Sequence, residues 1–136
     1  MAPLSGQLAQ LDEPYDLAVS VLDPAALNRL DEVAQRDPTL LPRLVELYLA
    51  DTPDRLQALR AAVERQDAAA VRAVAHALRG SSETFGAHEM VGHCEFLEYM
   101  PPEWDGPRID AHLTGLIEAY GRTRAALQRM VAAKEP

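Results

Sequence analysis

Apolar residues recur at intervals of three and four along most of this 136-residue chain, which places them on one face of an α-helix. The pattern predicts a short helix over residues 24–36 and four longer ones over residues 40–65, 68–85, 87–100 and 108–133. Amphipathic helices joined by short turns bury their apolar faces against one another. The sequence therefore predicts an all-α protein: an antiparallel up-down-up-down four-helix bundle with a short additional N-terminal helix across one end.

Prolines, a glycine and a capping residue mark the ends of these segments. Asp23 can accept hydrogen bonds from the free amides of a helix start, and Pro24 fits the first helical position. Gly86 is a stop signal for the third helix, and Pro101-Pro102 ends the fourth.

Pro53 lies inside the second segment and leaves two alternatives. The segment is either two helices, with Thr52 as a cap between them, or one bent helix. The apolar period resumes on a compatible face after the proline, which favours one bent helix.

The length of the chain allows one domain with its own hydrophobic core. Residues 22–133 carry the helical pattern and predict that domain. Residues 1–21 contain Pro3, Gly6 and Pro14 and have no sustained helical period. We expect them to form an N-terminal extension that is only partly ordered.

The charge balance argues against two classes of partner. The formal net charge is −8, whereas a phosphate backbone or an anionic membrane surface is bound by a basic face. No segment approaches the roughly 18 apolar residues of a membrane span. The single cysteine, Cys94, allows no intrachain disulfide, as is usual in a reducing compartment. We therefore expect a cytoplasmic protein that binds neither nucleic acid nor membrane.

Residues 75–86 place one imidazole on the polar face of the third predicted helix. At about 100° per residue, this face carries Arg72, His76, Arg79, Gly80 and Glu83. The apolar stripe, which includes Val71, Leu78 and Phe85, lies opposite, so His76 should face solvent. A glycine inside a helix costs about 1 kcal/mol relative to alanine. Gly80 is best explained by access of another molecule to the imidazole beside it.

The same string resembles the active-site motif of the histidine-containing phosphotransfer (HPt) domains of bacterial and plant phosphorelays. The family pattern is His-x-Leu-Lys-Gly-Ser, then small residues and a hydrophobic-Gly pair; here it reads His-Ala-Leu-Arg-Gly-Ser-Ser over residues 76–82, then Phe85-Gly86. The resemblance covers about residues 22–130. Other segments that resemble family positions are Leu22-Asp23-Pro24, residues 47–53, Asp67, Met90, Cys94 and Leu97-Glu98.

The resemblance implies a role for each residue of the motif. His76 would carry a phosphoryl group, Arg79 would stabilise its charge, and Gly80 would give steric access. Arg72 is a second cation that could support the site from the other side. Glu83 lies two turns from His76 and brings negative charge towards it.

The resemblance also implies the partners. A receiver domain would supply the catalytic apparatus and Mg²⁺, so this chain is expected to be a phosphoryl carrier rather than an enzyme, with no cofactor or metal of its own. The partners would be response-regulator receiver domains and/or a hybrid sensor histidine kinase. They would dock on the third helix around His76 and on adjoining parts of the second, where we expect a modest apolar patch. The chain itself is expected to be a monomer.

The sequence departs from the family pattern at two places. Arg79 stands where the family usually has lysine, which keeps the charge but changes its geometry. Glu83 and Thr84 stand where alanine and asparagine are common. Glu83 supports an alternative function, a binding module that sequesters a receiver or another signalling partner without passing phosphate.

A second alternative is a metal-dependent enzyme. Imidazole and thiolate suit zinc, and the chain offers His88, His93, Cys94 and His112. Their spacing is poor for a zinc site, and Cys94 falls on the apolar stripe of its helix. The position of Cys94 therefore favours a packed, inert thiol over a nucleophile.

Overall fold

The structure is a computed structural model that describes residues 21–134. Residues 1–20, and with them nearly all of the expected extension, lie outside the described residues. Five α-helices make up the described part of the chain: α3 (Pro24–Arg36), α4 (Leu40–Glu64), α5 (Ala68–Glu83), α6 (His88–Glu98) and α7 (Gly106–Lys134). An antiparallel bridge between Leu22 and Ala87 is the β-type pairing found there. The all-α class is confirmed.

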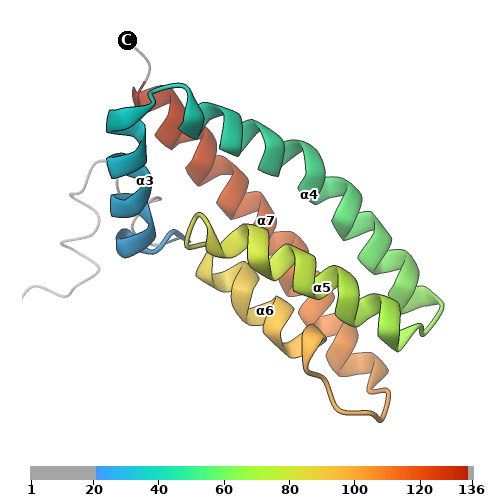
Figure 1. Ribbon diagram of the computed structural model, residues 1–136. Coiled ribbons are helices and arrows are strands. Elements are labelled where there is room, and N and C mark those ends of the chain that lie inside the picture. The colour runs from blue at the N-terminus through green and yellow to red at the C-terminus, as the bar shows by residue number, and fades with distance from the viewer. Residues whose placement is uncertain (1–20, 135–136) are drawn as a thin grey trace, which may run out of the picture.

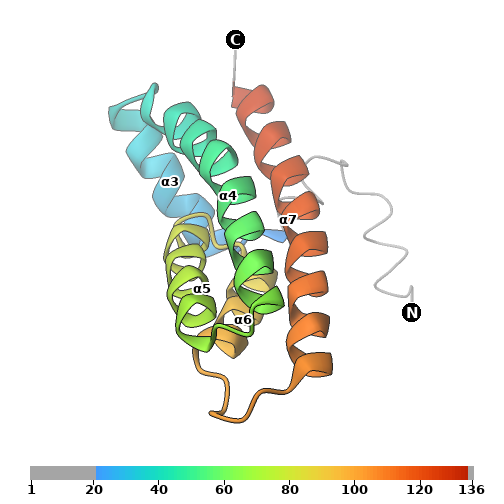
Figure 2. The same cartoon turned by 90° about the vertical axis from the view of Figure 1, so that its right-hand side faces the viewer.

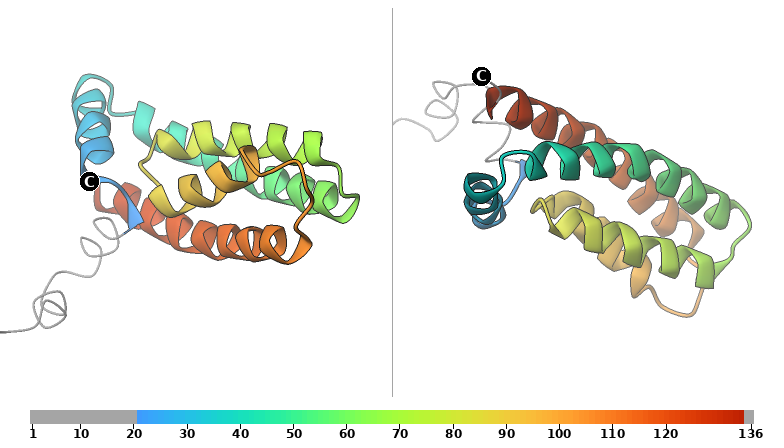
Figure 3. Two further views of the ribbon diagram at one scale, coloured as in Figure 1. Left: turned by 90° about the horizontal axis from the view of Figure 1, so that it is seen from below. Right: turned by 45° about the horizontal axis from the view of Figure 1, so that its top comes forward.

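The four longer helices form a bundle in which the chain reverses direction from each helix to the next (Figure 1). α5 and α7 each pack against both α4 and α6. α4 and α7 have 25 and 29 residues, whereas α5 and α6 have 16 and 11. The two long helices therefore extend past the short pair (Figure 2), and α3 lies across that end (Figure 3).

The core of the bundle takes apolar side chains from every helix. Each of the four longer helices contributes at least one leucine with no exposed surface: Leu59, Leu78, Leu97, Leu116 and Leu127. Tyr48 is also buried, and its hydroxyl group lies 2.8 Å from Ser82 Oγ and 3.0 Å from Met90 Sδ. Burial raises the pKa of Tyr48 to about 12. None of the helices in the described residues is long and apolar enough to cross a membrane.

Side-chain caps begin two of the helices where the sequence predicts a start. The carboxylate of Asp23 accepts a hydrogen bond of 3.2 Å from the amide of Ala25, and Pro24 occupies the first turn of α3. Asp67 accepts one of 3.1 Å from the amide of Ala70 at the start of α5. The register of α5, which carries the motif, is therefore set at its first turn.

The proline in the second segment does not divide it. α4 runs as one helix from Leu40 to Glu64 with Pro53 inside, which confirms the one-helix alternative. The apolar face continues across the proline, with Tyr48 and Thr52 buried before it and Leu56 after it. Burial of this face stabilises the helix enough to offset the cost of about 3 kcal/mol of an internal proline.

The helix ends differ from the prediction by about two residues at several places. α6 ends at Glu98 rather than at residue 100, because Met100 precedes Pro101 and a residue before proline disfavours helical dihedrals. α7 begins at Gly106 rather than at residue 108, since Pro107 is compatible with a first turn. Val33, expected on the apolar face of the first helix, is 38% exposed.

The turn between α5 and α6 is fixed to the start of α3. Gly86 has a φ of +64°, a conformation that favours glycine. Its carbonyl oxygen accepts a hydrogen bond of 2.8 Å from the amide of Asp23. A Cβ atom at residue 86 would lie 2.7 Å from Asp23 Cβ and 2.8 Å from Ala26 Cβ. α5 therefore ends at Glu83, two residues before the predicted end, and three residues form the turn.

Candidate functional site

His76 lies on the outer face of α5, with 68% of its side chain exposed. The opposite face of the helix is buried in the core through Val71, Ala75, Leu78 and Ser82. The expectation that His76 faces solvent is confirmed. Its ring is open to another molecule while the helix under it is held by the bundle.

A carboxylate from the neighbouring helix holds one nitrogen of this ring. Glu98, the last residue of α6, lies with Oε1 2.5 Å from His76 Nδ1. The pKa of Glu98 lies below its usual value, chiefly because Arg79 donates hydrogen bonds to the carboxylate. Desolvation raises this pKa, and the hydrogen bond with His76 lowers it further. Because an ionised carboxylate can only accept, Nδ1 donates the hydrogen bond. Nε2 then carries the lone pair of the neutral ring.

Arg79 lies one turn from His76 and is already paired. Its Nε donates to Glu98 Oε2 at 2.6 Å and its Nη2 to Glu98 Oε1 at 3.3 Å, a two-point contact with one carboxylate. Its Nη1 donates to Glu83 at 3.1 Å, and the guanidinium lies over the ring of Tyr99 at 5.9 Å. These partners raise the pKa of Arg79, chiefly through Glu98.

Gly80 is exposed, and it has open space where a side chain would be. A Cβ atom at residue 80 would have no neighbour within 4 Å other than its own helix backbone and adjacent residues. Close helix packing therefore does not explain this glycine.

The two supporting residues of the sequence prediction take different positions. Glu83 contacts Arg79 and so reaches the site through that arginine. Arg72 instead donates a hydrogen bond of 3.4 Å to the carbonyl oxygen of Met100, beyond the end of α6. Its hydrogen bond is thus to the segment that follows α6, and no hydrogen bond joins it to His76.

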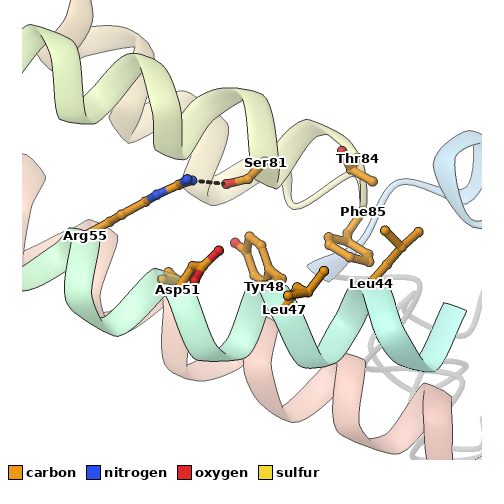
Figure 4. A pocket seen from close by; sticks show the side chains of 9 residues that line it. Leu44, Leu47, Tyr48, Asp51, Arg55, Ser81, Thr84 and Phe85 are labelled. Carbon is orange, nitrogen blue, oxygen red and sulfur yellow. Dashed lines mark hydrogen bonds between the residues drawn. The ribbon is translucent and has the colours of Figure 1, made fainter. Parts of the chain in front are cut away.

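A groove between α4 and α5 borders this face of the molecule (Figure 4). It has a volume of about 170 Å³. Leu47, which is 60% exposed, stands at its edge, and Arg55 crosses it to lie 3.5 Å from Ser81 Oγ and from the carbonyl oxygen of Ala77. An apolar patch is thus present where the sequence predicts one. The groove is lined by Leu44, Leu47, Tyr48, Asp51, Thr52, Arg55, Ser81, Thr84 and Phe85.

The candidate metal ligands do not form a cluster. Within residues 21–134, no group of three or more histidine, cysteine or acidic side chains could hold a metal ion. Cys94 is buried, which raises the pKa of its thiol to about 12. His93 and His112 do meet, with 3.0 Å between their Nδ1 atoms, and His112 stacks on Phe96.

The histidine pair predicts a loss of stability in weak acid. Burial, then His93 and Arg108, lower the pKa of His112, so the unfolded chain binds a proton more readily than the folded one. The free energy of unfolding should therefore fall as pH drops below about 6.5. Urea unfolding at a series of pH values from 7.5 to 5.5 measures this change. The interval lies above the pH range in which most carboxylates titrate. His112→Gln should flatten the slope, and an equal slope in that variant would contradict the assignment.

Glu98 is the site residue whose role the sequence does not reveal. The sequence places Leu97-Glu98 at positions that resemble the family, but without a function. Residues 76 and 98 are 22 positions apart on different helices, so no helical periodicity connects them. Only the packing of α6 against α5 brings the carboxylate to the imidazole.

The comparisons with known proteins identify the family of the chain. Residues 43–133 match the family described as the Hpt domain. Because this match covers more than half of the chain, the chain belongs to the family of histidine-containing phosphotransfer domains. Family members are phosphoryl carriers of phosphorelays and interact with receiver domains and kinases.

One solved structure is similar over most of its length. It is described as histidine-containing phosphotransfer protein B (HptB) from Pseudomonas aeruginosa PAO1. The two chains share 26% identity with a TM-score of 0.70, covering 83% of this chain and 96% of that one. No curated protein sequence matches this chain.

Proposed function

We propose that His76 accepts a phosphoryl group from the phosphorylated aspartate of one receiver domain and passes it to another receiver. The observation that carries this proposal is the hydrogen bond of 2.5 Å between His76 Nδ1 and Glu98, on a ring that is otherwise exposed. In this proposal the contact orients the imidazole and leaves the nucleophilic lone pair on Nε2. A fixed and accessible nucleophile is what in-line attack by a protein side chain requires.

The transfer needs no general base on this chain. The Nε2 lone pair attacks phosphorus, the bond from phosphorus to the aspartyl oxygen breaks, and the aspartate leaves with the electron pair. The proton on Nδ1 stays in place, so the ring becomes a phosphorylated imidazolium. Its positive charge develops next to the carboxylate of Glu98, which stabilises it. Mg²⁺ would belong to the receiver, and this chain would act without a cofactor.

The neighbouring residues have separate tasks in this proposal. Arg79 is one turn from the ring and is the cation that can stabilise the phosphoryl oxygens. Gly80 leaves the surface next to the ring free for the partner. Arg72 would contribute through the segment that follows α6, since its guanidinium contacts Met100.

The partner would dock on α5 and the adjoining part of α4. This surface combines the exposed ring with the groove whose edge carries Leu47. A small apolar patch surrounded by polar side chains, here Asp51 and Arg55, is typical of a protein interface. The groove would orient the receiver so that its aspartyl phosphate faces Nε2.

Transfer from a panel of phosphorylated receivers tests the proposal. Receiver domains are phosphorylated with acetyl phosphate and Mg²⁺ and incubated with the full chain. The wild type should gain an acid-labile, alkali-stable label, and His76→Gln should gain none. A wild type that no receiver labels, or a label that persists in His76→Gln, would overturn the proposal.

A second variant, His76→Ala, separates the carrier from a module that only sequesters its partner. A sequestering module predicts that His76→Ala binds the receiver and signals as the wild type does. A phosphoryl carrier predicts that His76→Ala binds but no longer transmits the signal. Binding is measured by titration calorimetry and signalling by phosphorylation of the second receiver.

A further inference from the structure

The charge around Arg79 is unusual for a residue that would stabilise a dianionic group. Two carboxylates contact its guanidinium, Glu98 at 2.6 Å and Glu83 at 3.1 Å. The cluster of Arg79, Glu83 and Glu98 therefore has a net negative charge before any phosphoryl group arrives.

Most of the hydrogen-bond donors of Arg79 also have an acceptor already. A guanidinium has five N–H donors. Nε and Nη2 donate to Glu98, and Nη2 also lies 3.5 Å from the hydroxyl group of Tyr99. Nη1 donates to Glu83. A phosphoryl group on His76 can gain full contact with Arg79 only by displacing a carboxylate.

The two carboxylates differ in what they contribute. Glu98 is 11% exposed and also contacts the His76 ring, so it orients the nucleophile. Glu83 is 50% exposed, follows Arg79 by four residues on the same helix and contacts it with one oxygen. Glu83 is thus the partner that a phosphoryl group would displace more readily. It can be changed while His76, Arg79 and Glu98 remain.

We propose that Glu83 competes with the phosphoryl group for Arg79 and thereby makes the phosphohistidine of this chain short-lived and readily donated. The inference rests on the proposed function and assigns Glu83 as a positioning residue, which acts through Arg79. In the free phosphorylated protein, the competition favours the hydrolysis step. In that step a water oxygen bonds to phosphorus, the Nε2–P bond breaks with its electrons returning to Nε2, and both water protons stay on the phosphate.

The lifetime of the phosphohistidine tests this without a protein partner. The full chain is labelled with phosphoramidate, from which Nε2 takes the phosphoryl group and ammonia leaves, and loss of the label is followed after the reagent is removed. Glu83→Gln keeps the size of the side chain and removes its charge. Its label should last about two to five times longer than that of the wild type, the range expected for one exposed ion pair.

A second Glu–Arg pair provides the matched control. Glu89 and Arg122 pair at 2.6 Å between α6 and α7, so Glu89→Gln removes one charge and one ion pair elsewhere in the bundle. Its label should decay as in the wild type. The advantage of Glu83→Gln should also shrink in high salt, because salt screens exposed charges.

The outcomes separate the two proposals. A wild type labelled on His76 with the same lifetime in Glu83→Gln overturns the role of Glu83 and leaves the carrier function standing. Equal lengthening in Glu89→Gln and Glu83→Gln also overturns it, because a general charge effect would then explain the result. If neither phosphoramidate nor any receiver labels His76, the carrier function fails and the role of Glu83 fails with it.

Discussion

Gly86→Ala should destabilise the bundle by about 2–5 kcal/mol. A left-handed conformation costs an L-residue roughly 1–2 kcal/mol, and forcing a methyl group into a packed site costs about 1–3 kcal/mol more. Both apply here, because φ is +64° and the new Cβ atom would lie 2.8 Å from the backbone nitrogen of Asp23. That nitrogen cannot rotate away as a side chain could. The hydrogen bond from Asp23 to residue 86 would weaken as well.

Urea unfolding followed by circular dichroism measures this loss. Gly92→Ala is the matched control, since Gly92 lies inside α6, and a Cβ atom there would have no neighbour within 4 Å apart from its own helix and adjacent residues. The control should gain up to about 1 kcal/mol from improved helix propensity. Equal stability of the two variants would mean that the turn does not anchor α3.

The fold of this chain was predictable because its helices carry their own signals. The capping carboxylate of Asp23 and the stop at Gly86 are local features, and the structure has a helix beginning or ending close to each of them. The apolar period that continues across Pro53 predicted one helix correctly, because the residues that share this period form one buried face. Ends near prolines shifted by about two residues, because steric effects between adjacent residues compete with the period there.

The site was predictable only in part. The exposure of His76 follows from the period of α5, which the sequence contains. The pairing of Arg79 with Glu98 depends on where α6 crosses α5, and that crossing is set by the whole core. For the same reason, the sequence indicated that Arg72 could reach the imidazole from the other side, whereas packing places its guanidinium beside Met100. Residue type and period predict which face is functional, but not which side chains meet on it.

Gly80→Gln should slow transfer from a receiver about a hundredfold while the protein stays folded. The surface next to His76 has no side chain at residue 80, and the structure leaves open space there. Glutamine is a better helix former than glycine by several tenths of a kcal/mol, so stability should rise slightly. The added side chain would stand where the partner must approach. Misplacing the reacting atoms by about 1 Å costs on the order of a hundredfold in rate.

Phosphoramidate separates access from chemistry in this variant. The reagent is small enough to reach Nε2 past a glutamine, so Gly80→Gln should be labelled by it at nearly the wild-type rate. Transfer from a phosphorylated receiver, measured on the same preparation, should show the large loss. Gly121→Gln is the control, because Gly121 is an exposed glycine of α7 with equally open space, and α7 packs on α4 and α6. If receiver transfer falls equally in both variants, or phosphoramidate labelling falls with it, Gly80 does not serve partner access.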